Sequence, residues 1–187
     1  LETVEVKGKT IGFLGSSRVI PVYDWTAGEQ KPGVAITYDP GMLLKDIAAA
    51  KQVCDYVVVY AHWGKEKAVT PEEYQQTMGR QYIDAGADLV IGSHPHVLQG
   101  IEYYKGKPIV YSLGNFVFGS SIPKTMLLQV DVPQEGEPSL ILIPGTSSAG
   151  YTRMLTEESE KEAFYRCMEE LSFGISVDET GGIRPKD

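Results

Sequence analysis

The chain has 187 residues, which is long enough for one sizeable hydrophobic core and too short for two full domains. Its hydrophobic fraction of 42% and charged fraction of 22% are ordinary for a globular protein, and no basic stripe with interleaved aromatic residues suggests a nucleic-acid partner. Because 25 acidic residues outnumber 17 basic ones, giving a net charge of −8, an anionic substrate would have to meet a local positive centre such as a metal ion.

The lengths of the apolar runs and the first residues of the chain indicate where in the cell the protein is located. No run approaches the roughly 18 apolar residues of a membrane span, and no signal peptide opens the chain. It begins at Leu1 without an initiator Met, so we expect a trimmed fragment that is itself soluble. We expect the whole protein to be extracytoplasmic or membrane-associated through an absent N-terminal segment.

The two cysteines, Cys54 and Cys167, lie far apart and belong to no metal-binding or redox pattern. Neither has a histidine nearby in sequence. We predict two buried thiols, and a disulfide between them remains an open alternative.

Strand and helix signals alternate over the first part of the chain. Residues 4–14 predict a hairpin that leads into a buried strand at 10–14. Residues 15–38 have no clear period and predict a long ordered loop. Asp39-Pro40 predicts the start of a helix, because a capping carboxylate precedes a proline at the first helical position. The apolar face of that helix comprises Leu43, Leu44, Ile47, Ala50 and Cys54.

A strand, a helix and another strand follow. Residues 55–61 predict a strand, and its run of apolar and aromatic residues without alternation indicates burial on both faces, as in a parallel or mixed sheet. Thr70 and Glu73 predict a capping box for a helix that runs to about Ala85. Residues 88–91 predict the next buried strand. The core face of the helix comprises Tyr74, Met78, Tyr82 and Ala85.

The second half predicts a more antiparallel arrangement. Residues 100–104 and 108–113 flank a Lys-Gly-Lys turn and predict a hairpin. Residues 125–132 and 139–143 predict two further strands. Residues 145–150, Gly-Thr-Ser-Ser-Ala-Gly, predict a flexible loop.

A final helix and a tail complete the predicted order. Thr156 predicts the cap of a helix that ends near Leu171. We treat residues 1–174 as part of one domain and residues 175–187 as a loose polar tail. The element order predicts an α/β fold in which a βαβαβ unit continues into antiparallel strands. The buried face of the helix comprises Ala163, Phe164, Cys167, Met168 and Leu171.

All three histidines follow predicted strands. His62 ends one strand and His94 follows the next, and functional residues of βαβ sheets gather beyond such strand ends. Neighbouring strands lie about 5 Å apart, so we expect the side chains to converge. Pro95 favours an extended His94, which would turn His94 and His96 the same way, toward two metal ions about 3.5–4 Å apart. A mononuclear zinc site and three unrelated hydrogen-bonded histidines are the alternatives.

A two-metal site also needs carboxylates. The candidates in the chain are Glu66, Asp84, Asp88 and Glu102. Of these, Glu66 follows the His62 turn and is predicted to accept an N–H from a ligand histidine. The sequence has no Asp-x-His or Gly-Asp pattern, so part of a binuclear site would be missing.

Two more residues are candidates for the pocket. Trp63 is predicted to form a wall beside His62. Gly114-Asn115 breaks a strand predicted over residues 111–118: either Gly114 or Asn115 relieves a positive φ there, or Asn115 lies near the metal pocket and donates to a substrate oxygen.

Four motifs together carry a family resemblance. They are His-Trp-Gly-x-Glu (62–66), Asp-Ala-Gly-Ala-Asp (84–88), Gly-Ser-His-Pro-His-Val (92–97) and Tyr-Ser-Leu-Gly-Asn-Phe-Val-Phe (111–118). In this order and spacing they resemble the CapA family of poly-γ-glutamate capsule biosynthesis proteins, which is related to calcineurin-like metallophosphatases. The resemblance covers roughly residues 5–172.

The resemblance implies a portion of a four-layer α/β/β/α metallophosphatase-like sandwich with mixed sheets. It implies that His62 and His94 bind one divalent ion and His96 another, the metal being Mn, Fe or Zn. The implied function is capsule biosynthesis, with a metal-dependent hydrolase activity in the complete domain. A non-catalytic role in a capsule-polymer synthesis or export assembly, in contact with poly-γ-glutamate and capsule-synthesis proteins, is the alternative.

Two departures from the family pattern matter. Glu66-Lys67 stands where the family has Glu-Tyr, a change at the rim of the pocket. The family's N-terminal ligand motifs are not in the chain, so we expect this fragment alone to be inactive. Half of a sandwich would expose an apolar face, so we expect the missing half, a separate chain or a second copy to cover it.

Overall fold

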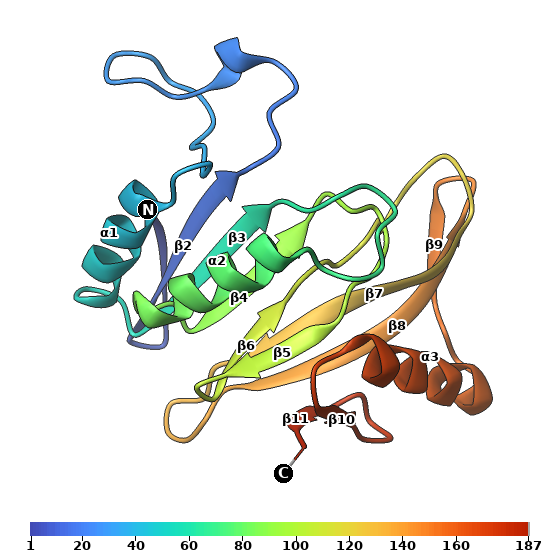
Figure 1. Cartoon of the computed structure of the whole chain (residues 1–187). Coiled ribbons are helices and arrows are strands. Elements are labelled where there is room, and N and C mark those ends of the chain that lie inside the picture. The colour runs from blue at the N-terminus through green and yellow to red at the C-terminus, as the bar shows by residue number, and fades with distance from the viewer. Residues whose placement is uncertain (187) are drawn as a thin grey trace.

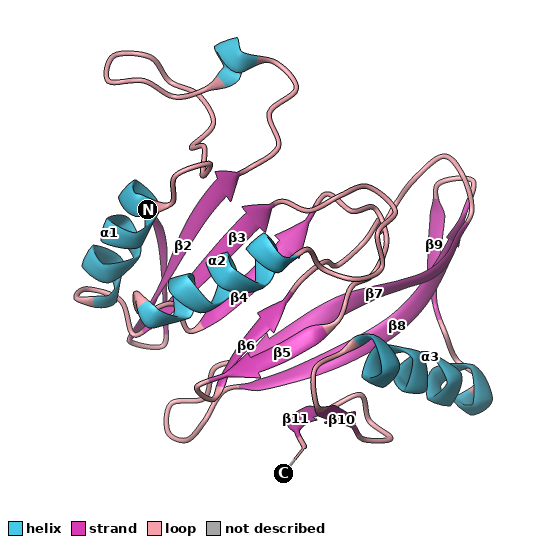
Figure 2. Cartoon of the chain, in the orientation of Figure 1, coloured by secondary structure: helices cyan, strands magenta, loops and turns pink. Residues whose placement is uncertain are grey.

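The computed structural model describes residues 1–186 of the chain (Figure 1). Strands and helices alternate in its first half, and strands dominate its second half (Figure 2). The strands are β1 (Glu2–Val6), β2 (Lys9–Ser17), β3 (Tyr56–His62), β4 (Leu89–Ser93), β5 (Ile101–Tyr104), β6 (Lys107–Val110), β7 (Ile122–Asp131), β8 (Ser139–Ser148), β9 (Tyr151–Met154), β10 (Ile175–Val177) and β11 (Ile183–Pro185). The helices are α1 (Gly41–Lys51), α2 (Glu73–Asp84) and α3 (Glu158–Leu171), with a 3₁₀ turn at Tyr23–Trp25. No helix within residues 1–186 is long and apolar enough to cross a membrane.

The largest sheet has the strand order β1-β2-β3-β4-β6-β5. Strands β2, β3, β4 and β6 run parallel, while β1 and β5 are antiparallel edge strands. Its register pairs Ser17 with His62 and His62 with Ser93, which aligns the carboxyl ends of three strands. The prediction of an α/β fold with a mixed sheet is therefore confirmed.

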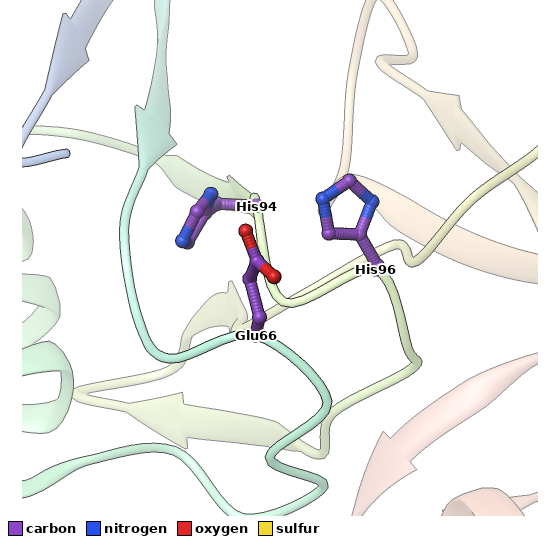
Figure 3. Close-up of side chains that lie close together, drawn as sticks. All are labelled: Glu66, His94 and His96. Atoms are coloured by element: carbon purple, nitrogen blue, oxygen red, sulfur yellow. The ribbon is translucent and has the colours of Figure 1, made fainter. Parts of the chain in front are cut away.

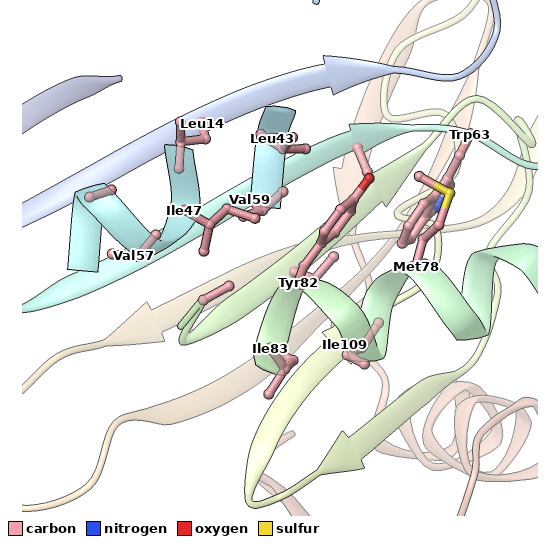
Figure 4. Packing of buried hydrophobic residues seen from close by; sticks show 14 of the residues in the cluster. Leu14, Leu43, Ile47, Val57, Val59, Trp63, Met78, Tyr82, Ile83 and Ile109 are labelled. Carbon is pink, nitrogen blue, oxygen red and sulfur yellow. The ribbon is translucent and has the colours of Figure 1, made fainter. Parts of the chain in front are cut away.

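Helices α1 and α2 cover one face of this sheet (Figure 4). Ile47 of α1 packs in one cluster with Val57 and Val59 of β3, and Tyr82 of α2 packs with Trp63. All five side chains are at most 1% exposed. Full burial of each aliphatic side chain contributes about 1.5–3 kcal/mol, so this layer fixes α1 and α2 firmly on the sheet.

The opposite face of the sheet packs on a second, three-stranded antiparallel sheet of order β7-β8-β9 and on α3. Val58 and Leu89 from the large sheet share a buried cluster with Leu142 of β8 and Met168 of α3. The central strands are thus covered on both sides, as their unbroken apolar runs predicted.

The cover over this second face is incomplete at β1, β2 and the end of β3. Val4, Val6, Phe13 and Tyr60 lie on the same face as Val58 by their register, yet they are 49%, 47%, 44% and 47% exposed. An apolar surface of four side chains is therefore left open beside the second sheet.

Helix starts differ from the prediction by a few residues. Asp39 Oδ1 accepts the Gly41 N–H at 2.9 Å as predicted for a capping carboxylate, but Pro40 precedes the helix instead of opening it. The capping residues of α2 are Glu72 and Gln75, not Thr70 and Glu73. Thr70 stays outside the helix because its carbonyl accepts a side-chain N–H from another loop.

The predicted flexible loop at 145–150 is wrong. Strand β8 continues to Ser148 and β9 follows after a two-residue turn, so residues 145–148 all pair with β9, and Gly145 and Ser147 also pair with β7. Ser147 is buried, and Thr146 Oγ1 donates to the Ile122 carbonyl at 3.0 Å. Ladder pairing overrides the weak strand propensity of these small polar residues.

The last helix also departs from its prediction. Glu157 and not Thr156 precedes the first residue of α3. Ala163 is exposed, whereas Tyr165, which was not predicted to face the core, is buried. The buried face of α3 is thus rotated slightly about the helix axis from the face that the apolar residues predicted.

Residues 175–187 were predicted to be a loose tail, and this is wrong over the described part. β10 and β11 form a hairpin whose Ile175 and Ile183 are buried in the second cluster. The Val177 N–H donates to Glu169 Oε1 at 2.7 Å, which ties the hairpin to α3. Residue 187 lies outside the described residues.

Cys54 and Cys167 carry free thiols, which excludes the disulfide. Cys54 is buried as predicted, while Cys167 is only half-buried. The predicted loop of residues 15–38 begins later than expected, because β2 extends to Ser17, and the remainder projects from the end of β2 (Figure 1).

Candidate metal centre

The predicted convergence of the strand-end histidines is confirmed. His62 is the last residue of β3 and His94 follows the last residue of β4 directly. His62 Nε2 lies 2.9 Å from His94 Nδ1, and the ring centroids are 4.7 Å apart. Parallel pairing of β3 with β4 is sufficient to bring the two rings together.

The backbone of the second histidine pair differs from the prediction. His94 and His96 have φ angles of +97° and +63°, so the segment is not the extended strand that Pro95 was expected to favour. The turn still holds their ring centroids 5.9 Å apart. Left-handed backbone at such residues costs of the order of 1–3 kcal/mol and persists where the surroundings enforce it, commonly at functional sites.

Glu66 joins this pair from the loop after β3 (Figure 3). Ligand atoms of Glu66, His94 and His96 all lie within 4.8 Å of one another. Donors bound about 2.0–2.2 Å from one ion lie within about 4.4 Å of each other, so small side-chain rotations would suffice to bind it. Imidazole and carboxylate donors suit Zn, Mn or Fe, and the group therefore fits a divalent ion.

His62 contacts His94 but does not belong to that three-residue group. Burial lowers the pKa of His62 below its ordinary value, and the neighbouring His94 and His96 lower it further. Burial also lowers the pKa of His94, although the Glu66 carboxylate opposes the shift. A lowered pKa favours the neutral ring, which is the form that ligates metals.

Asn115 lies at the histidines, as predicted. Its Oδ1 is 2.8 Å from His96 Nδ1, so that nitrogen can donate to Asn115 and leave Nε2 to face a metal. The Phe118 ring lies 6.1 Å from the His96 ring. The positive φ in this turn belongs to Gly114, at +64°, and not to Asn115.

Trp63 does not form the predicted pocket wall. Its side chain is 1% exposed, stacks on Tyr82 and donates from Nε1 to the Tyr111 carbonyl at 2.9 Å. The residue after His62 points to the face covered by α2, which takes the indole into the core. Trp63 supports the strand end from beneath.

The other candidate carboxylates do not reach the site. Each is held by basic or phenolic partners elsewhere in the fold: Asp84 by Lys105, Asp88 by Lys51 and Lys107, and Glu102 by Arg80 and Tyr111. Asp84 is the last residue of α2 and Asp88 directly precedes β4, so both carboxylates serve the ends of these elements. Within residues 1–186, Glu66 is the one acidic side chain grouped with the histidines.

A pair of buried amides, absent from the sequence predictions, positions the Glu66 loop. Gln99 Nε2 donates to the Ala68 carbonyl at 2.8 Å, and Gln75 Nε2 donates to Gln99 Oε1 at 3.0 Å. The Lys67 N–H also donates to the Pro95 carbonyl at 2.7 Å. Gln75 and Gln99 are 0% exposed, and only their placement at a helix start and beside the histidine turn could have singled them out.

A cavity of about 820 Å³ opens beside the centre. Glu66, His96 and Asn115 line one end of it, and it extends toward β7 and α3. The candidate metal centre therefore has adjoining space for a ligand.

Comparison with known proteins identifies the family. A family model described as bacterial capsule synthesis protein PGA_cap matches residues 1–120. The capsule biosynthesis protein CapA of Bacillus anthracis is 37% identical over 168 residues, which is 86% of this chain and 40% of that protein.

Two further relatives match shorter stretches. The PGA biosynthesis protein CapA of Bacillus subtilis is 43% identical over 121 residues, covering 65% of this chain and 31% of that protein. A probable polyglutamine synthesis accessory protein of Mycobacterium tuberculosis is 34% identical over 99 residues, or 50% of this chain and 26% of that protein. The chain thus spans less than half the length of these relatives. From the match over residues 1–120, the chain belongs to the bacterial capsule synthesis protein family, PGA_cap, which is the CapA family that its histidine motifs resemble.

Proposed function

We propose that this chain supplies one side of a divalent-metal centre in a capsule biosynthesis protein of the CapA type, and that the complete protein is a metal-dependent hydrolase. The observation that carries the proposal is the grouping of Glu66, His94 and His96 within 4.8 Å, with His62 in contact with His94. Relatives named for capsule and PGA biosynthesis support the biological role.

In this proposal His62, His94 and His96 hold the metal ions, with Glu66 as a further ligand or as an acceptor for a histidine N–H. A divalent ion such as Mn, Fe or Zn supplies Lewis acidity to hydrolysis. Asn115 fixes the tautomer of His96 through their 2.8 Å contact. Its amide N–H₂ remains available to donate to a substrate oxygen at the mouth of the cavity.

We further propose that the complete fold is a four-layer α/β/β/α sandwich. Helices on one face of the large sheet and a second sheet packed on its other face support the α/β/β part of that arrangement. The open surface at Val4, Val6, Phe13 and Tyr60 supports a cover supplied by a further segment, a separate chain or a second copy. A monodisperse monomer by light scattering that binds no hydrophobic dye would contradict this cover.

The alternative is a non-catalytic component of a capsule-polymer synthesis or export assembly. The observation that favours it is the shortage of acidic ligands, since Glu66 alone stands with the histidines among residues 1–186. Such a component would bind poly-γ-glutamate or capsule-synthesis proteins. For either role, we propose an extracytoplasmic or membrane-associated protein, as the capsule biosynthesis relatives suggest.

Metal content separates the two functions. Elemental analysis of the purified chain after incubation with Mn, Fe or Zn should find bound metal, and His94→Ala should lose most of it. Glu73→Gln, which alters an exposed carboxylate on α2, is the control and should keep the wild-type content. Metal-free wild-type protein that retains its circular dichroism spectrum would favour the non-catalytic role.

A further inference from the structure

Arg18 lies directly after β2, at the same edge of the large sheet as His62. Its backbone N–H donates to the His62 carbonyl at 2.8 Å, which extends the pairing of β2 with β3 by one residue. Parallel pairing aligns the carboxyl ends of the two strands, so Arg18 lies beside the turn that follows His62.

The Arg18 guanidinium makes contacts that are not ion pairs. Its Nη1 donates to the carbonyl oxygens of Thr37 and Tyr38 at 3.0 and 3.1 Å. Its Cζ lies 5.2 Å from the centroid of the Tyr38 ring and 4.5 Å from that of the Tyr74 ring. Within residues 1–186 no carboxylate forms an ion pair with it. A planar cation that stacks on rings and donates to carbonyls holds its neighbours in a fixed geometry.

The backbone that receives the guanidinium is itself fixed. The Ser17 N–H donates to the Ala35 carbonyl at 2.8 Å, and the Thr37 N–H donates to the Ser17 carbonyl at 3.0 Å. Thr37 is 2% exposed. The guanidinium therefore connects backbone that is paired with the end of β2 to the ring of Tyr74.

Tyr74 carries these contacts to the turn after β3. It lies in the first turn of α2, and its hydroxyl oxygen accepts the Gly64 N–H at 2.6 Å. Gly64 follows His62 by two residues and has a φ of +90°. Arg18 thus acts on this turn twice, directly at the His62 carbonyl and at Gly64 through Tyr74.

We propose that Arg18 is a positioning residue of the candidate metal centre. Its backbone fixes the end of β3, and its guanidinium holds the Tyr74 ring where the hydroxyl accepts the Gly64 N–H. Gly64 lies between His62 and Glu66 in the chain, so fixing it limits the movement of both side chains. The proposal rests on the proposed function only in taking His62 and Glu66 as residues of the metal centre.

Zinc affinity, measured by chelator competition, tests the proposal. Arg18→Met removes the guanidinium but keeps a long unbranched side chain, and Tyr74→Phe removes only the acceptor hydroxyl. Each should weaken zinc binding about three- to tenfold, less than the 10–100-fold typical for a direct partner of a ligand. Arg18→Lys keeps a cation beside the rings and should recover part of the loss. Arg166→Met, at a side chain on α3 that is 69% exposed, is the control and should bind zinc as the wild type does.

The double variant Arg18→Met/Tyr74→Phe tests whether the guanidinium acts through Tyr74. Both changes release the same Gly64 N–H, so the double variant should lose little more zinc affinity than the more affected single variant. Losses that multiply would contradict the route through Tyr74.

Amide hydrogen exchange, followed by NMR in EDTA, provides a readout that needs no metal. The Gly64 N–H should exchange faster in Arg18→Met and in Tyr74→Phe than in the wild type, and Arg166→Met should leave it unchanged. The amide of Val59, a fully buried residue of β3, reports on the stability of the sheet as a whole. A positioning role requires that exchange speeds up more at Gly64 than at Val59.

Unchanged zinc affinity and unchanged Gly64 exchange in Arg18→Met would overturn the proposal and leave the metal centre in place. Equal acceleration at Gly64 and Val59 would also overturn it, because Arg18 would then only stabilise the fold. A wild-type chain that binds no zinc would instead contradict the proposed function, and the exchange rates would still decide whether Arg18 positions the turn.

Discussion

His62 Nε2 and His94 Nδ1 lie 2.9 Å apart and join the ends of two neighbouring parallel strands through their rings. Two protonated imidazoles would place N–H groups against each other, so the contact requires at least one neutral ring. This requirement agrees with the lowered pKa of both histidines. One ring therefore donates and the other accepts, and each keeps its second nitrogen outside this contact.

Removal of His62 should weaken metal binding without unfolding the chain. His62→Ala deletes the partner of His94, and loss of an orienting group beside a ligand typically costs 10–100-fold in metal affinity. Chelator competition with Zn measures the change. Lys65→Ala, an exposed change in the same loop, is the control. Unchanged affinity in His62→Ala would remove His62 from the centre.

Replacement of Gln99 should lower both the stability of the chain and its metal affinity, because Gln99 holds the loop that carries Glu66. Gln99→Leu removes the donor to the Ala68 carbonyl and leaves buried polar groups without partners, which costs about 1–3 kcal/mol. Urea unfolding should show this loss, and metal affinity should fall because the Glu66 loop is released. Gln52→Leu, at an exposed amide after α1, is the control.

The double variant Gln75→Leu/Gln99→Leu sharpens this test. The two amides contact each other at 3.0 Å. The double variant should therefore lose less free energy of unfolding than the sum of the losses in the two single variants. Strict additivity would show that the amides act independently and do not form one network.

Sequence patterns predicted that the strand-end histidines converge, because buried strands joined by a helix commonly pair in parallel. His62 and His94 follow β3 and β4 as expected, and Asn115 lies near them. The backbone at His94 was not predictable in this way. The preference imposed by Pro95 is local, whereas the observed φ of +97° is set by the whole turn and its neighbours.

The errors elsewhere have a common physical origin in tertiary pairing. Thr146 and Ser147 have the composition of a loop, yet β8 continues through them because β9 pairs with both residues and β7 pairs with Ser147. The tail around Ile175 and Ile183 is mostly polar, and two buried isoleucines suffice to fix it. The sequence around Trp63 does not distinguish a pocket wall from a core residue, because either kind of residue can follow the end of a strand.

Gly92 should be required for the packing of β4 under the site. A Cβ at this position would lie 2.0 Å from the Tyr111 carbonyl oxygen and 2.3 Å from Trp63 Nε1. Gly92→Ala should therefore destabilise the chain by at least the 1–3 kcal/mol typical of overpacking, measured by urea unfolding. Gly15→Ala is the matched strand control, because nothing lies within 4 Å of its Cβ position. Equal stability of the two variants would contradict the packing.

Glu169 should make the β10–β11 hairpin sensitive to acid. The Val177 N–H donates to its carboxylate at 2.7 Å and Lys186 pairs with it at 3.3 Å, and these contacts, the first more than the second, lower the pKa of Glu169 below its ordinary value. A depressed folded-state pKa stabilises the chain above the unfolded-state pKa, and this stabilisation is lost as the pH falls through the folded-state value. The contribution should not exceed about 1 kcal/mol, since the group is close to solvent.

Thermal unfolding of the wild type and of Glu169→Gln measures this contribution. The wild type should be the more stable at pH 6–7, where its carboxylate is ionised, and the difference should shrink below the ordinary glutamate pKa of about 4.3. Glu170→Gln, on the exposed side of α3, should show no such pH-dependent difference. A Glu169→Gln difference that stays constant down to pH 3 would mean that the ionised carboxylate does not hold the hairpin to α3.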